Sequence, residues 1–128
     1  MTTVIVNSGS RYKVNRKKIR EAVVGFLKKH KIPGEVEVGV NIVGARKMRE
    51  LNLRFRGKDE ACPVLSFPLE RGVRGGFVNP PDKILRLGDV VISHPEVVRL
   101  SAEENVLVEE KIKELVEHGV RHLLGLGG

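Results

Sequence analysis

The chain has little cysteine, few aromatic residues and no long hydrophobic run. Its 128 residues include one cysteine, Cys62, which excludes an intramolecular disulfide and suits a reducing cytoplasm. No stretch approaches the about 18 apolar residues of a membrane span, and the first ten residues lack the basic and apolar regions of a signal peptide. We therefore expect a cytoplasmic protein that folds as a single domain over residues 1–128.

Aromatic residues make up only 4% of the chain, which disfavours a base-stacking platform of the sheet-surface kind. Positive charge, in contrast, is abundant, with a net charge of +7. Residues 1–58 contain 15 Lys or Arg against 4 acids, a net charge of +11, whereas residues 59–128 have a net charge of −4. This segregation predicts a nucleic-acid partner contacted mainly through phosphates, and the alternative is an ordinary solvated lysine-rich surface.

Hydrophobic periodicity predicts strands interleaved with helices. Alternation and short apolar runs predict strands at 3–7, 35–43, 64–67 and 87–93, and helical spacing predicts helices at 16–30, 45–55, 95–105 and 107–124. Asn15 is the expected N-cap of the first helix, and Phe55 is expected to face inward with Met48 and Leu51. Residues 68–86, rich in glycine and proline, are predicted to form a long loop or loose hairpin. The pattern indicates an α+β fold, with about four helices packed on a mixed four-stranded sheet.

The last predicted helix contains two histidines, His118 and His122, one turn apart on the same face. Their spacing of roughly 6 Å along the axis lets both imidazoles bind one divalent ion, as in H-x-x-x-H zinc hydrolases. The alternative is a pair of solvated or core-edge histidines that bind nothing. Gly119 stands where zinc peptidases have the glutamate that acts as general base, which disfavours a peptidase mechanism.

The chain has three other histidine and cysteine residues. Cys62 and His94 are not assigned as ligands, although His94, at the end of a predicted strand, is the better of the two candidates. His94 is otherwise interpreted as a surface histidine at a helix start. His30 lies at the lysine-rich end of the first helix and is expected on the surface.

Four segments together resemble the YbeY family of bacterial endoribonucleases and rRNA maturation factors. In sequence order they are residues 51–59, 64–69, 88–93 and 118–125. The resemblance implies a zincin-like fold, a zinc site built on the motif H-G-x-x-H-x-x-G-x-D-H, and a role in small-subunit rRNA processing and ribosome quality control. It also implies that His118 and His122 bind Zn²⁺ and that Arg56 faces the RNA.

The chain departs from the family pattern at two places. Cys62 and Pro63 stand where the family usually has Thr-Asp, and Gly128 stands where the third zinc histidine is expected. Catalytic zinc normally has three protein ligands, so position 128 matters. Three interpretations are open: a truncated or altered form of a parent with His at 128, an oxygen ligand from the C-terminal carboxylate of Gly128, or a degenerate site that binds RNA without cutting.

The first hypothesis is a zinc-dependent, single-strand-specific endoribonuclease that matures the 3′ end of small-subunit rRNA. Arg56 would contact the scissile or a neighbouring phosphate, with Arg54 and Lys58 binding substrate beside it. The alternative for Arg56 is a surface salt bridge to Asp59 or Glu60. The second hypothesis is a non-catalytic rRNA-binding assembly factor with a degenerate metal site, and a hydrolase of small substrates is disfavoured by the charge.

Overall fold

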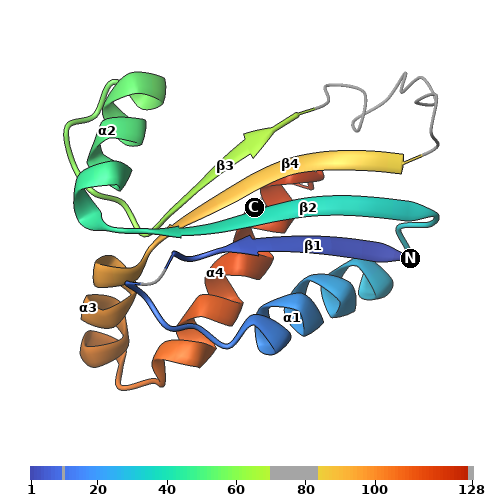
Figure 1. Cartoon of the computed structure of the whole chain (residues 1–128), viewed down its shortest axis with the longest axis horizontal. Coiled ribbons are helices and arrows are strands. Elements are labelled where there is room, and N and C mark those ends of the chain that lie inside the picture. Colours follow the sequence, from blue (N-terminus) through green and yellow to red (C-terminus); the bar gives the residue numbers. More distant parts are fainter. Residues whose placement is uncertain (10, 70–83, 127–128) are drawn as a thin grey trace.

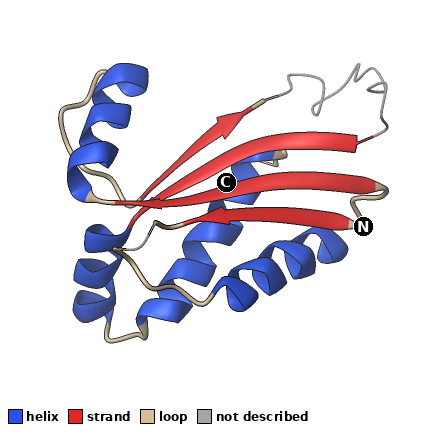
Figure 2. Cartoon of the chain, viewed as in Figure 1, coloured by secondary structure: helices blue, strands red, loops and turns tan. Residues whose placement is uncertain are grey.

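The fold is a four-stranded mixed sheet with helices on both faces (Figures 1 and 2). The computed structural model describes residues 1–9, 11–69 and 84–126. The elements are β1 (Thr2–Asn7), α1 (Arg16–Lys29), β2 (Glu35–Val43), α2 (Ala45–Arg56), β3 (Val64–Pro68), β4 (Ile84–Ser93), α3 (His94–Glu104) and α4 (Val108–Leu123). The strand order is β1-β2-β4-β3, with β1, β2 and β4 parallel and β3 antiparallel to β4. The α+β class and the mixed sheet predicted from the sequence are confirmed.

The main core lies between the sheet and helices α1 and α4, which cover one face (Figure 1). β2 alternates as expected, because Val36, Val38, Val40 and Ile42 are all buried beneath these helices. Asn15 caps α1 by accepting a hydrogen bond of 3.1 Å from the backbone N–H of Lys18, which confirms the predicted start of that helix. No helix in the described part of the chain is both long and apolar enough to cross a bilayer.

A second, smaller core on the other face of the sheet is formed by Met48, Leu65 and Val91, beneath α2. The prediction that Met48 and Leu51 face inward is confirmed, because Met48 belongs to this cluster and Leu51 packs against it. The same prediction is wrong for Phe55, which is 58% exposed. Phe55 lies in the last turn of α2, where its ring meets the ring of Phe67 at 5.1 Å between centroids instead of entering the core.

β4 begins at Ile84, three residues earlier than predicted, so residues 84–86 are strand rather than loop. Pro68, also assigned to that loop, is the last residue of β3, and residues 70–83 of the predicted loop lie outside the described part. A bulge interrupts the alternation of β4. Glu37 pairs with Arg86 whereas Val38 pairs with Gly88, so β4 has one extra residue between these two pairs. Gly88 has φ of 129°, and a Cβ there would lie 2.2 Å from the carbonyl oxygen of Phe67, so only glycine fits.

Candidate functional site

The two histidines of α4 lie together on its exposed side. The apolar stripe of the helix, which includes Leu115, Val116 and Leu123, is buried against the sheet, and this orientation leaves His118 and His122 exposed to solvent. Their ring centroids are 4.6 Å apart, and the ring planes are inclined at 57°. Both rings are close to each other and exposed, so the pair is accessible to an ion from solvent.

Glycine at position 119 brings this turn of α4 close to the sheet. A Cβ at Gly119 would lie 2.5 Å from Cγ1 of Val90 on β4, closer than side-chain contacts normally come. On the neighbouring strand β3, the hydroxyl of Ser66 donates a hydrogen bond of 3.2 Å to the Gly119 carbonyl oxygen. The histidine turn is therefore held against both β4 and the edge strand β3.

The described residues supply two of the three ligands that a catalytic zinc takes. Two imidazoles are suitable donors for zinc, and the centroids of these two rings are 4.6 Å apart. His118 also lines an open depression between α1 and α4 together with Glu114 and Glu117. Nevertheless, no group of three His, Cys, Asp or Glu side chains suited to a metal occurs within residues 1–9, 11–69 and 84–126. Gly128, the third position expected from the family motif, lies outside the described residues.

Within the described residues, none of the other histidine and cysteine side chains joins the histidine pair in a metal-ligating group of three. His94 begins α3 and stacks on Tyr12 with ring centroids 4.8 Å apart, and burial lowers its pKa. Burial likewise raises the pKa of the Cys62 thiol, with the nearby Arg56 guanidinium acting in the opposite sense. His30 is half-buried rather than on the surface as expected, because its ring packs on Phe26 at 4.3 Å between centroids. Each of the three is thus engaged in local packing.

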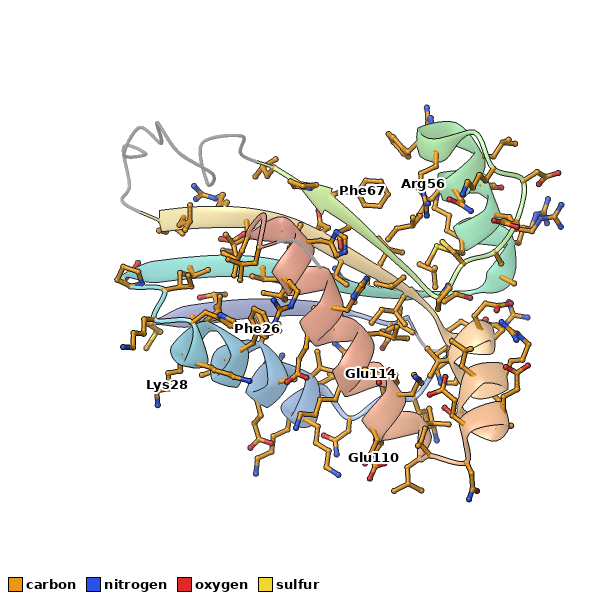
Figure 3. All side chains as sticks on the ribbon, turned by 180° about the vertical axis from the view of Figure 1, so that it is seen from behind. Phe26, Lys28, Arg56, Phe67, Glu110 and Glu114 are labelled. Atoms are coloured by element: carbon orange, nitrogen blue, oxygen red, sulfur yellow. The ribbon has the colours of Figure 1, made fainter. Side chains whose placement is uncertain are left out.

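The three basic residues predicted to bind substrate lie at and just after the C-terminal end of α2. Arg54, Arg56 and Lys58 are all exposed, and Arg56 is labelled on α2 in Figure 3. Of the two alternative partners for Arg56, Asp59 and Glu60, Asp59 is instead paired with Arg49 at 3.1 Å. Arg56 lies beside Cys62, and its guanidinium remains open to solvent.

The edge strand β3 connects α2 with the histidine helix. Consecutive residues of a strand point to opposite faces of its sheet. Accordingly Ser66 contacts α4 on one face, whereas Phe67 contacts α2 through Phe55 on the other. Arg56 and the histidine pair therefore flank the same edge strand from its two faces. Among the described residues, no hydrogen bond or ion pair connects Arg56 with either histidine.

Two features of this region were missed from the sequence. The first is the contact between Phe55 and Phe67, which lie on elements separated by a polar turn. The second is the Ser66 bond to the Gly119 carbonyl, which joins residues 53 positions apart. The only available signal was that Ser66, a polar residue, lies within the otherwise apolar strand at 64–67.

The site and the fold together define a small α+β protein in which a helix with two exposed histidines packs beside the edge strand of a mixed sheet. The chain belongs to the YbeY family, since the family model described as endoribonuclease YbeY matches residues 5–127.

Three relatives, each described as endoribonuclease YbeY, show the extent of the similarity. The protein from Persephonella marina is 34% identical over 128 residues, which cover 98% of this chain and 78% of that protein. The protein from Roseiflexus sp. is 40% identical over 84% of this chain, and the one from Dehalococcoides mccartyi is 38% identical over 70%. The chain spans 66% and 55% of the lengths of these last two relatives.

A solved structure also resembles the fold. The solution structure of a protein from Thermotoga maritima superimposes with a TM-score of 0.60 and 28% sequence identity. The match covers 98% of this chain and 73% of that protein. The four-stranded mixed sheet and its helices are therefore similar in arrangement to that solved structure.

Proposed function

We propose that the chain is a zinc-dependent endoribonuclease that cuts single-stranded RNA during maturation of the 3′ end of small-subunit rRNA and in ribosome quality control. The observation that carries the proposal is the exposed histidine pair, with its rings 4.6 Å apart. The names of the relatives, each an endoribonuclease YbeY, give the reaction, and the basic first half of the chain favours a polyanionic substrate.

Each part of the site has a role in this proposal. His118 and His122 hold the zinc ion, which when bound supplies a water of lowered pKa and positive charge near the phosphoryl oxygens. The planar guanidinium of Arg56 binds a phosphate through two parallel hydrogen bonds, a geometry that lysine cannot offer. Arg54 and Lys58 bind neighbouring phosphates, because both are exposed within the same short segment.

A second candidate function is a ribosome-assembly factor that binds rRNA without cutting it. It is favoured by the count of metal ligands, since the described residues offer two histidines and no group of three. Metal analysis of the purified chain separates the two functions. Stoichiometric zinc, with cleavage of a single-stranded RNA abolished by a chelator, supports the nuclease. A metal-free protein that binds the RNA with a steep salt dependence supports the assembly factor.

Replacing Arg56 by alanine should lower RNA cleavage by about 10- to 100-fold, because one charge-assisted phosphate contact is removed from the transition state. The thermal midpoint should change little, since the side chain is exposed. The measurement is the single-turnover rate on a fluorescent single-stranded RNA, alongside a melting curve. Arg46→Ala, on the exposed first turn of the same helix, is the matched control and should lose much less of the rate, because it lies at the opposite end of α2 from Arg56. An Arg56→Ala protein that cleaves as fast as Arg46→Ala would remove Arg56 from the site.

Introducing histidine at position 128 should strengthen zinc binding, because the spacing from His122 then completes the family's three-histidine motif. The gain should exceed the roughly 10- to 100-fold in affinity that partners outside the ligand set typically contribute. Competition with a chromophoric zinc chelator measures the affinities of Gly128→His and the unchanged chain. Gly128→Ala is the control and should match the unchanged chain, and equal affinity for all three proteins would contradict the three-ligand interpretation.

A further inference from the structure

Two of the four phenylalanines meet at the surface where α2 approaches the edge of the sheet. Phe55 is 58% exposed, and its ring meets that of Phe67 edge to face, with an interplanar angle of 68°. The guanidinium carbon of Arg54 lies 5.9 Å from the centroid of the Phe55 ring. We refer to this surface group as the aromatic step; it consists of Phe55, Phe67 and Arg54. Figure 3 shows Phe67 on β3, facing the side on which α2 lies.

Packing of the small core beneath α2 does not explain the exposed position of Phe55. The small core beneath α2 is completed by Met48, Leu65 and Val91, so Phe55 adds nothing to its interior. A phenylalanine left more than half exposed forfeits most of the roughly 1.5–3 kcal/mol that burial of such a side chain provides. The Phe55 ring nonetheless has two defined contacts, one with the Phe67 ring and one with the Arg54 cation.

The charge around the aromatic step indicates which kind of partner would cover it. Residues 45–58, which include α2, contain six Lys or Arg and a single acid, Glu50. An apolar protein segment has no need of such an excess of positive charge, whereas a nucleic-acid strand does. An exposed aromatic ring among cations is the combination by which proteins bind single strands, since bases stack on the ring while phosphates bind the cations.

We propose that the aromatic step binds an unpaired base of a single-stranded RNA, with the base stacked on the exposed part of the Phe55 ring near the Arg54 guanidinium. The inference deepens the proposed function by naming how that site selects unpaired strands. A duplex keeps its bases stacked on one another and cannot offer one to the ring. The next residue along α2 is Arg56, so the phosphates flanking the stacked base would lie within reach of the guanidinium assigned to the phosphate contact.

The absence of tryptophan from the chain allows a direct test. Phe55→Trp introduces a single indole at the aromatic step, and a base stacked on it should quench its fluorescence. The full chain is titrated, in the presence of chelator so that nothing is cut, with a short oligoadenylate and with an abasic strand of the same length. We expect quenching to saturate with the oligoadenylate and little change with the abasic strand. Phe55→Ala should weaken oligoadenylate binding by about tenfold, measured by anisotropy of a labelled strand.

Leu53→Ala is the matched control, because Leu53 is 51% exposed on the same helix and has no ring to stack on a base. It should bind the oligoadenylate like the unchanged chain, and all variants should keep the same salt dependence, since no phosphate contact is altered. Two results would overturn the aromatic step: equal affinity of Phe55→Ala and the unchanged chain, or indole emission of the Phe55→Trp variant that does not change when RNA binds. Either would leave the surface as a candidate for an apolar protein partner.

The same titrations separate this inference from the proposed nuclease. A chain that quenches and binds as expected but fails to cut RNA with zinc supplied would disprove the nuclease and keep the aromatic step. A chain that cuts RNA, but whose Phe55→Ala variant binds the strand with unaltered affinity, would disprove the aromatic step and keep the nuclease. If the unchanged chain binds neither strand, the aromatic step is disproved outright.

Discussion

Alanine at either His118 or His122 is expected to reduce the proposed RNA cleavage by at least about 100-fold, because a single remaining imidazole would not hold the proposed zinc ion that would supply the reactive water. The double replacement should be hardly slower than either single one, since both residues serve one ion and their effects are not additive. Zinc content should fall in parallel with the rate. The measurements are single-turnover cleavage of a single-stranded RNA and metal analysis of the same preparations.

The structure offers a control for this expectation within the same helix. Lys113 is exposed on α4, away from the histidine turn, so Lys113→Ala should retain both zinc and cleavage. Stability should also be preserved in the histidine variants, because both side chains are exposed. Wild-type cleavage by His118→Ala and His122→Ala would show that the pair is a surface feature of α4 and would remove the proposed zinc site from these two residues.

Replacing Gly119 by alanine should lower the free energy of unfolding by about 1–3 kcal/mol, because the added methyl must displace Val90 or move the helix away from the sheet. A Cβ at this position would lie 2.5 and 2.7 Å from the two methyl carbons of Val90, which is fully buried and has a stiff, β-branched side chain. The thermal midpoint, followed by circular dichroism, should drop by about 5–10 °C.

A second glycine gives the opposite expectation. Gly25 lies within α1, and a Cβ there would meet nothing within 4 Å, so Gly25→Ala should raise the free energy of unfolding by about 0.5–1 kcal/mol. Adding Val90→Ala to Gly119→Ala should give a loss smaller than the sum of the two single losses, because the shortened side chain makes room for the methyl. A destabilisation of Gly25→Ala as large as that of Gly119→Ala would show that close packing is not the cause.

Much of the fold could be predicted because local pattern and tertiary structure agree. Alternation located β2 without error, and the cap at Asn15 located the start of α1. The prediction failed where tertiary contacts decide. The bulge at Gly88 interrupts the alternation of β4, so its first residues resembled loop. Phe55 continues the apolar spacing of Met48 and Leu51, but the small core ends before the last turn of α2.

The candidate site was predictable only in its local part. The spacing of His118 and His122 is enough to place two rings on one face of a helix, and the structure brings them together. Periodicity contains no information on which strand lies beside that helix, so the Ser66 bond to Gly119 could not be foreseen. For the same reason the sequence could not show that Phe55 and Phe67 meet, since that contact depends on the pairing of β3 with β4.

The order of strands in the sheet has a consequence for when the site can form during folding. β4 lies between β2 and β3, and Val40 pairs with Val90, roughly fifty positions later, so this ladder requires the closure of a long loop. Until β4 has paired, β3 has no neighbour to position it and α4 has no Val90 on which to rest. We therefore expect the histidine turn and the basic end of α2 to come together late. Under the proposed function, a partly folded chain would attract RNA through its basic residues before it could cut it.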